Sequence, residues 1–150
     1  MEKIVWSCKP FKDLTNEELY EIFRLRMEVF VVEQNCPYQD ADGKDLKSLH
    51  VQGKQGDKLI AYTRIVPPDV SYKEVSIGRV ITSKEVRKTG AGKMLMSETI
   101  VYLKKEFGNV PIRIGAQEYL KKFYEGFGFI SEGDSYIEDG IPHIIMLLTP

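Results

Sequence analysis

The sequence contains few of the residues that build disulfide frameworks or metal centres. Cys8 and Cys36 are the only cysteines among 150 residues, and His50 and His143 are the only histidines. Two cysteines do not make a disulfide framework, and no group of Cys and His side chains has the spacing of a zinc site. The simplest interpretation is a reduced, cytoplasmic protein without a metal.

Long hydrophobic runs and an excess of one charge are also lacking. The longest apolar run, 144–148, is far shorter than the roughly 20 residues that cross a bilayer, and the N-terminal residues lack the apolar core of a signal peptide. Lys and Arg number 21 against 22 Asp and Glu, a net charge of −1. Proteins that bind duplex nucleic acids usually carry a strong basic excess. We therefore expect neither a membrane nor a nucleic acid among the partners.

The remaining composition is that of an ordinary folded domain. Hydrophobic residues make up 43% of the chain and charged residues 29%, and a chain of this length buries roughly 68–70% of its unfolded surface. No linker, repeat or low-complexity segment divides the sequence. We therefore expect one domain over residues 1–150.

The order of predicted elements indicates an α+β fold. Thr15 to Glu18 has the capping-box pattern that opens helices, and apolar residues follow at helical spacing. The run 29–32 is apolar on all sides, so we expect the end of this helix to enter a core. Strands are expected at 3–8, 49–52, 59–66, 75–82 and 111–116, with a closing hairpin around Asp139-Gly140.

The connections predict how these elements are arranged. Short turns between the strands at 49–52, 59–66 and 75–82 favour antiparallel pairing. Further helices are expected after a glycine-containing loop at 87–93 and over 119–127. The strand at 111–116 follows a helical crossover and should run parallel to its predecessor. The expected architecture has three layers, α/β/α: a mixed, mostly antiparallel sheet with a central βαβ unit and helices on both faces.

The loop from Arg87 to Lys93 has the features of an anion site. Its small residues let backbone N–H groups approach a ligand, and the start of the following helix carries partial positive charge. A P-loop is excluded, because Arg87 and Met94 stand where Gly and Ser or Thr are needed. The Rossmann fingerprint is excluded because Leu95 stands in place of its third glycine. The alternative is a plain strand-to-helix turn.

The same loop resembles a known family. Arg87 to Gly92, read as Arg-Lys-Thr-Gly-Ala-Gly, matches the Q/R-x-x-G-x-G/A signature of the GNAT superfamily of N-acetyltransferases. It follows a predicted strand, opens a long helix and precedes the run 123–129, which resembles the family segment fYeklGF. The segments 26–45 and 138–143 are similar to those of the ElaA-like branch. The resemblance covers nearly the whole chain in element order and implies a fold of GNAT type.

The resemblance implies a function and a cosubstrate. It implies transfer of an acetyl group from acetyl-CoA directly to a primary amine, with no covalent enzyme intermediate and no metal. In the family the glycine loop holds the pyrophosphate, and the preceding strand pairs with the pantetheine arm. The strand at 111–116 would splay away to make room, with Gly115 allowing a close approach of the backbone. Carried over, the cofactor-binding residues are Val80, Ile81, Arg87, Lys88, Thr89, Gly90, Ala91, Gly92, Lys93 and, where the family often has Asn, Gln117.

Two side chains are the candidate catalytic residues. The resemblance places Tyr124 where the family has a Tyr that protonates the departing thiolate, a role typically worth ~10²–10⁴-fold; packing between Phe123 and Phe127 is the alternative. Glu33 ends the first helix near where acceptors bind in this fold, and is the candidate base; a solvated carboxylate is the alternative. His50, His143, Glu138 and Asp139 are lesser candidates, and a strand histidine is more often a hydrogen-bonded core residue.

The acidic stretch 40–45 does not have the calcium-binding pattern. An EF-hand loop needs acidic residues at alternate positions with Gly at the sixth, and Gly43 comes directly after Asp42. A turn or the rim of an acceptor site is expected, whose carboxylates would favour a cationic amine. Arg26 is expected to be a helix-surface charge, with binding of an acceptor carboxylate as the alternative. Cys36 has no partner pattern for a nucleophile.

Several properties are left open by the sequence. The acceptor is a small-molecule or peptide amine: a polyamine, an amino sugar, an amino acid or a protein N-terminus. The acyl chain length is not determined, and the resemblance makes a homodimer plausible. Two other functions are retained: a CoA-binding sensor or interaction module in which Tyr124 only packs, and a nucleotide- or nucleic-acid-binding module that uses the basic loop.

Overall fold

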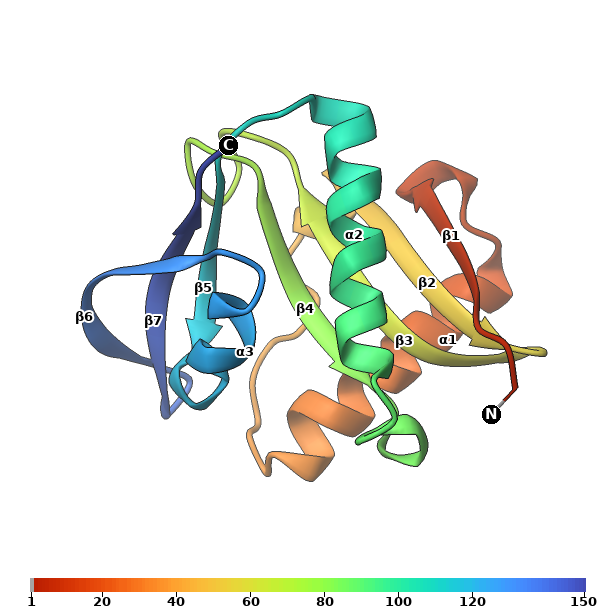
Figure 1. The fold of residues 1–150 in the computed structure, drawn as a ribbon. Helices are drawn as coiled ribbons and strands as arrows, with labels where there is room; N and C mark the ends of the chain where they lie inside the picture. The colour runs from red at the N-terminus through yellow and green to blue at the C-terminus, as the bar shows by residue number, and fades with distance from the viewer. Residues whose placement is uncertain (1) are drawn as a thin grey trace.

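The computed structural model describes residues 2–150. Within them, strands and helices alternate as an α+β fold (Figure 1). The helices are α1 (Asn16–Arg26), α2 (Ala91–Phe107) and α3 (Lys121–Glu125). The strands are β1 (Val5–Pro10), β2 (Leu49–Gln55), β3 (Lys58–Val66), β4 (Ser76–Thr82), β5 (Ile112–Gln117), β6 (Ile130–Glu138) and β7 (Ile141–Leu148).

The strands form two antiparallel sheets that part in the middle of the molecule. One sheet has the order β1-β2-β3-β4 and the other the order β5-β7-β6. Their connection among the described residues is a parallel bridge between Val75 and Ile112, where the Arg113 N–H donates to the Val75 carbonyl at 3.1 Å. From there β4 and β5 diverge (Figure 1). The predicted parallel relation is confirmed at this bridge, and beyond it β5 splays away from β4, as the family resemblance implied.

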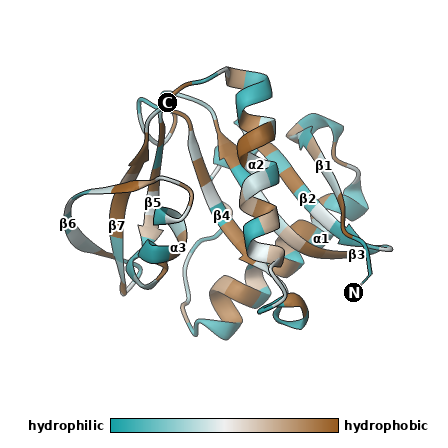
Figure 2. Cartoon of the chain, viewed as in Figure 1, coloured by the Kyte–Doolittle hydropathy of each residue, from teal (hydrophilic) through white to brown (hydrophobic). Residues whose placement is uncertain are grey.

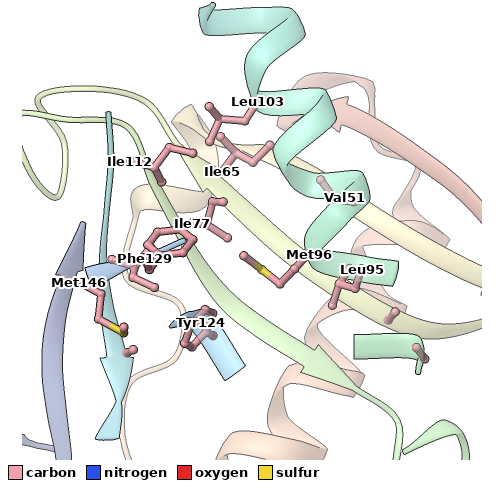
Figure 3. Close-up of a cluster of buried hydrophobic side chains, with 14 of the residues drawn as sticks. Val51, Ile65, Ile77, Leu95, Met96, Leu103, Ile112, Tyr124, Phe129 and Met146 are labelled. Atoms are coloured by element: carbon pink, nitrogen blue, oxygen red, sulfur yellow. The ribbon is translucent and has the colours of Figure 1, made fainter. Parts of the chain in front are cut away.

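Helices cover both faces of the first sheet, as predicted. Leu95, Met96 and Leu103 of α2 pack on one face with Ile60 and Ile65. Figure 3 shows this core reaching Phe129, just before β6, and Met146 on β7 of the second sheet. On the opposite face, side chains of α1 pack against β3 and β4 in a smaller core of Ile22, Leu25, Val29, Leu59, Tyr62 and Ile81. Alternation along β3 therefore serves two cores.

Figure 2 shows how hydropathy differs between the strands of the second sheet. β7 is mostly hydrophobic, whereas the outer strand β6 is mostly hydrophilic. This difference follows from position, because β7 is the central strand and β6 lies at an edge.

None of the helices among residues 2–150 is both long and apolar enough to cross a membrane.

The start of α1 forms as its capping pattern predicts. The Thr15 hydroxyl accepts the Glu18 N–H at 3.1 Å, and the Glu18 carboxylate accepts the Thr15 N–H at 3.0 Å. The helix then continues as a π-helix over Met27–Glu33, in which the Gln34 N–H reaches back five residues to Val29. The widened turn buries Val29 and leaves Val32 72% exposed. The helix therefore enters a core as expected, but only through part of the run, since Val29 is buried and Phe30 packs against this core while Val32 faces solvent.

Other predicted boundaries move by a few residues. The helix expected over 119–127 is a 3₁₀ turn, Glu118–Leu120, followed by the single-turn α3. Gly126 ends α3, since the N–H groups of Gly126 and Phe127 close the last turn. The first strand runs over Val5–Pro10 rather than 3–8, where it pairs with β2.

Candidate active site

A cavity of about 1020 Å³ opens where β4 and β5 separate. We call it the inter-sheet cavity. One wall is β4, which lines the cavity along its whole length, and the other is the end of β5 with α3. The start of α2, the π-helix and the segment after it complete the lining. The cavity brings together predicted residues from across the sequence: Glu33, Val80, Ile81, Arg87, Gly92, Gln117 and Tyr124.

The glycine loop bends sharply before α2 begins. Lys88 and Gly90 both have positive φ, at 65° and 90°, and glycine accepts this conformation without strain. The helical bonds begin with the Met94 N–H, which donates to the Gly90 carbonyl at 3.1 Å. The N–H groups before it therefore project from the helix start, where anions bind well. The predicted residues Lys88, Thr89, Gly90, Ala91 and Lys93 lie in this loop but outside the lining of the cavity.

A bulge interrupts β4 beside the cavity. Tyr62 and Arg64 on β3 pair with Ile81 and Gly78, so the two residues Arg79 and Val80 stand opposite one residue of β3. Arg79 has a φ of 52°. Bulges of this kind leave ladder groups unpaired, and β5 has already diverged on the other edge of β4. Backbone groups near Val80 are therefore available to a ligand in the cavity.

Tyr124 is held in the wall of the cavity by aromatic neighbours. Its ring makes edge contacts with Phe123 and Phe129 at centroid distances of 5.2 and 6.0 Å. The side chain is 6% exposed. Burial, with a smaller contribution from Tyr119, raises the pKa of the Tyr124 hydroxyl well above its usual value. The phenol therefore stays protonated and can act as a proton donor.

Glu33 forms an ion pair across the cavity entrance. Its Oε2 lies 2.8 Å from Nη1 of Arg87, and Nη2 of Arg87 donates to the Thr82 carbonyl at 3.0 Å. The π-helix brings Glu33 to this position at its last residue. Glu33 is thus neither a freely solvated carboxylate nor an unengaged base in this structure, since its charge is paired with an arginine of the glycine loop.

Gln117 has a partner that the sequence does not indicate. Its side-chain amide exchanges two hydrogen bonds, of 3.3 and 3.4 Å, with the amide of Gln34. The pair ties the end of β5 to the end of the π-helix, 83 residues apart in sequence. Because such a contact leaves no local pattern, sequence reasoning missed Gln34.

Three arginines and three aspartates form a buried network below the cavity. We call it the Arg–Asp network: Arg26, Arg64, Arg79, Asp40, Asp42 and Asp45. The acidic stretch 40–45 is thus a paired loop, and Asp42 also lines the cavity, as expected of a rim. Burial alone would raise the pKa of Asp42, but the Arg64 and Arg79 guanidinium groups and the Lys44 N–H outweigh it and lower the pKa to about 2.

The network corrects the expectation for Arg26. Its side chain is fully buried, with Nε 2.9 Å from Asp40 and Nη1 2.7 Å from Asp45. It is therefore not a helix-surface charge, and its guanidinium is occupied by these carboxylates. Arg64 and Arg79 were missed, although arginines in otherwise apolar strands are a signal, because buried charges are normally paired.

The two histidines occupy different surroundings. His50 is fully buried, with Nδ1 2.6 Å from the Tyr62 hydroxyl and Nε2 2.9 Å from the Asp45 carbonyl. It is the hydrogen-bonded core histidine that the sequence favoured. His143 instead lines the cavity, with Glu138 and Asp139 beside it. Cys36 donates its thiol to the Asp139 carbonyl at 3.2 Å, so it joins the segment after the π-helix to the closing hairpin.

The model of the acetyltransferase (GNAT) domain family matches residues 12–150. The chain belongs to the GNAT family. Among GNAT proteins it is similar to Protein ElaA of Escherichia coli, with 45% identity over 145 residues, 95% of each chain. The predicted ElaA-like resemblance is confirmed.

Solved GNAT structures share this fold closely. The crystal structure of Escherichia coli ElaA covers 97% of this chain and 99% of its own, with a TM-score of 0.91 and 43% identity. That of an acyl-CoA N-acyltransferase from Pseudomonas aeruginosa covers 98% and 100%, with a TM-score of 0.93 and 39% identity. The predicted α+β fold of GNAT type is confirmed by these likenesses.

Proposed function

We propose that the chain transfers an acetyl group from acetyl-CoA directly to a primary amine. The observation that carries this proposal is the inter-sheet cavity, which runs from the start of α2 along the bulged edge of β4 to Tyr124 on α3. Membership of the GNAT family supports acyl-CoA as the donor. The proposal extends this family assignment to the donor, the bond formed and the residues involved.

The described residues suit the parts of acetyl-CoA. The glycine loop, 87–93, offers the N–H groups of a helix start and the Arg87 side chain to a pyrophosphate. The edge of β4 at Val80 and Ile81 offers strand-like hydrogen bonds to the pantetheine amides. Gly115 on β5 also lines the cavity, and a Cβ there would lie 2.8 Å from the Tyr136 hydroxyl. The Gln34–Gln117 pair lies at the far end of β5 and closes the wall.

The reaction then uses two kinds of group. Backbone N–H groups at the β4 bulge polarise the thioester carbonyl and stabilise the oxyanion of the tetrahedral intermediate. The amine nitrogen forms a bond to the carbonyl carbon, and the carbon–sulfur bond breaks. The thiolate takes the phenol proton of Tyr124. Glu33 holds Arg87 in this scheme and thereby orders the glycine loop.

Thermal unfolding with and without acetyl-CoA tests the donor site. A ligand at ~100 times its dissociation constant stabilises by ~2.7 kcal/mol, which for this chain length raises the Tm by roughly 5–10 °C. We expect that rise with acetyl-CoA and with CoA, and little change with ATP. No rise in Tm with saturating acetyl-CoA would indicate that the glycine loop is only a strand-to-helix turn, and it would overturn the proposal.

Release of CoA thiol tests the transfer itself. Spermidine, glucosamine, alanine and a tripeptide with a free N-terminus represent the acceptor classes, and at least one should give thiol release above the rate with acetyl-CoA alone. Binding of CoA without turnover on a broad set of amines would support the CoA-binding sensor, which the packing of Tyr124 between Phe123 and Phe129 favours.

A further inference from the structure

We infer that His143 is the general base that takes a proton from the acceptor amine, and this role rests on the proposed acetyl transfer. An amine in neutral water is mostly an ammonium ion, which cannot attack a thioester until a proton leaves. The base must therefore face the cavity, present an unprotonated atom, and have a means of stabilising the proton it accepts. His143 meets these three requirements.

The hydrogen bond at Nδ1 determines which ring nitrogen is free. Nδ1 of His143 lies 2.7 Å from the Ile141 carbonyl oxygen. A carbonyl only accepts hydrogen bonds, so Nδ1 carries the proton in the neutral ring. The lone pair therefore resides on Nε2, the atom that takes up a proton. The Ile141 carbonyl, next to the Asp139-Gly140 turn, thus selects the tautomer that a base requires.

A carboxylate stands near the free nitrogen. Oε2 of Glu138 lies 3.7 Å from Nε2, too far for a hydrogen bond but close enough to stabilise the imidazolium after protonation. Tyr136 stacks on the ring with a centroid distance of 5.8 Å and an interplanar angle of 28°. Stacking on one side and the Nδ1 bond at the edge hold the ring in one orientation.

The ring is nearly buried but belongs to the cavity wall. Its side chain is 9% exposed and lines the inter-sheet cavity. The charged and titratable groups near it are Glu138 and Tyr136 on β6, Asp139 in the turn, and Tyr72 on the loop before β4. In register, His143 pairs with Gln117, the last residue of β5. Tyr124 lines the same cavity from α3.

Glu33 is less suited to this task. Its carboxylate is engaged by the Arg87 guanidinium at 2.8 Å, and releasing it would break the contact that orders the glycine loop. The other carboxylates near the cavity are either in the Arg–Asp network or at the solvent-exposed turn. His143 is the described side chain that combines an open lone pair with a place in the wall.

The proton balance of the reaction is then complete. Nε2 of His143 takes one proton from the ammonium ion and later releases it to solvent. The free amine bonds to the thioester carbon, the carbon–sulfur bond breaks, and the thiolate takes the phenol proton of Tyr124. The nitrogen loses its second proton as the amide forms, and through solvent this proton restores the phenol. The sum is one amide, one CoA thiol and one proton released.

Nuclear magnetic resonance tests the tautomer without any acceptor. The sequence has two histidines, and the structure gives them opposite tautomers, because Nε2 of His50 donates to the Asp45 carbonyl. A long-range ¹H–¹⁵N spectrum of the neutral protein should show one ring protonated at Nε2 and one at Nδ1. The His143→Gln variant should lose the Nδ1-protonated set. Two rings both protonated at Nε2 would overturn the inference.

Kinetics test the role itself. With the amine that the wild type acetylates, His143→Gln should lower kcat/KM by about 10²-fold or more and remove the acid limb of its pH profile, with the CoA-induced rise in Tm retained. Glu138→Gln, which keeps the ring and removes the neighbouring carboxylate, should lower kcat/KM less than His143→Gln does. Addition of imidazole should partly restore the rate of His143→Gln.

The outcomes distinguish a failure of the proposed role of His143 from a failure of the proposed acetyl transfer. A His143→Gln variant with the wild-type pH profile and rate, in a chain that still acetylates amines, would remove His143 and leave the proposed function standing. A wild-type chain that binds CoA but acetylates none of the four amines would overturn the acetyl transfer, and the role of His143 with it, even if the tautomers are as expected.

Discussion

At the scale of single residues, the Tyr124 hydroxyl illustrates how packing prepares a group for chemistry. Its pKa is raised because burial among Phe123 and Phe129 disfavours the phenolate. A phenol that keeps its proton in the free protein can give it to a thiolate as the carbon–sulfur bond breaks. The same packing explains why Tyr124 belongs to the core cluster in Figure 3.

Replacement of Tyr124 by Phe should separate chemistry from binding. Tyr124→Phe keeps the ring contacts and removes only the proton donor, so kcat should fall by ~10²–10⁴-fold while the affinity for CoA stays close to that of the wild type. Steady-state thiol release and CoA titration measure the two quantities. Tyr102→Phe on α2, which removes a hydroxyl outside the cavity, is the matched control. An unchanged kcat would show that the Tyr124 hydroxyl takes no part in the reaction and that the residue only packs in the core.

Residue-level predictions from the sequence succeed where the signal is local. Arg87 and Tyr124 lie in short motifs, and both line the cavity. Gln34 depends on a partner 83 residues away, and no pattern in the sequence marks it. An arginine in an apolar strand marks Arg79 as a buried charge, but its partner Asp40 lies 39 residues away and cannot be identified from the sequence. The buried position of Arg26 was missed for the same reason, because its partners lie in a loop 14 and 19 residues further along.

At the scale of elements, the first turn of α1 depends on a titrating group. Glu18 is nearly buried and accepts hydrogen bonds from the Thr15 N–H, from Gln52 and from Lys9. Burial alone would raise its pKa, but these bonds and the Lys9 charge outweigh it and lower the pKa from its ordinary 4.5 to about 2. The charged carboxylate therefore stabilises the folded state.

The Glu18 contribution should disappear in acid. Because its pKa is lower in the folded state, the stabilisation is fully present above about pH 4.5 and is lost as the pH falls towards 2. The difference in free energy of unfolding between the wild type and Glu18→Gln should therefore shrink over this range. Urea unfolding at several pH values measures it. Glu17→Gln, in the same turn but exposed, should show no such trend.

The strands contain a second local test, at a glycine covered by an aromatic ring. A Cβ at Gly53 on β2 would lie 2.5 Å from the Trp6 ring of β1, so Gly53→Ala must displace the ring. We expect it to lower the free energy of unfolding by about 1–3 kcal/mol. At Gly78 on β4 a Cβ meets nothing within 4 Å, and Gly78→Ala should stay within about 0.5 kcal/mol. Equal urea midpoints for the two variants would contradict this.

Elements could be predicted as far as their signals are local. The capping box, the glycine before α2 and the Asp139-Gly140 turn are each specified by a few neighbouring residues, and each appears in the structure. The π-helix was not predicted, because the apolar run 29–32 contains no mark of a widened turn. No sequence pattern indicates the 3₁₀ turn before α3 either.

At the scale of the whole molecule, two sheets meet at one bridge and then diverge. Val75 and Ile112 join them at one end, and side chains of both sheets share a core beneath α2. The opening between β4 and β5 exposes strand edges that would pair with each other in a continuous sheet. A ligand that fills this opening would contact both sheets at once.

Hydrogen exchange should reveal that contact. Saturating CoA should slow the exchange of backbone N–H groups most strongly in β4, in β5 and in the first turn of α2. The distant pair β1 and β2 should gain much less protection, because the cavity does not reach it. Mass spectrometry of exchanged peptides at short times measures the difference. Equal gains across all strands would indicate general stabilisation without a ligand between the sheets.

The global arrangement was predicted in its layers but not in its sheet. The order of elements and the turns between strands predict antiparallel neighbours and helices on both faces, which the structure has. Whether β5 continues the first sheet depends on how α2, α3 and both sheets pack together. This packing is the sum of many contacts between residues that are far apart in the sequence. The splay itself was expected only from the family resemblance, through the room that a pantetheine arm needs.

The π-helix at 27–33 determines the direction in which the residues after it face. A π-turn holds one residue more than an α-turn, so it is equivalent to a single insertion within a continuous helix. If the same residues wound as a regular α-helix, all that follows would be rotated by about 100° around the axis. Glu33 would then swing away from Arg87, and Gln34 from Gln117. The widened turn thus absorbs one extra residue, and a one-codon deletion within it would give a regular α-helix that keeps the later side chains near their present directions.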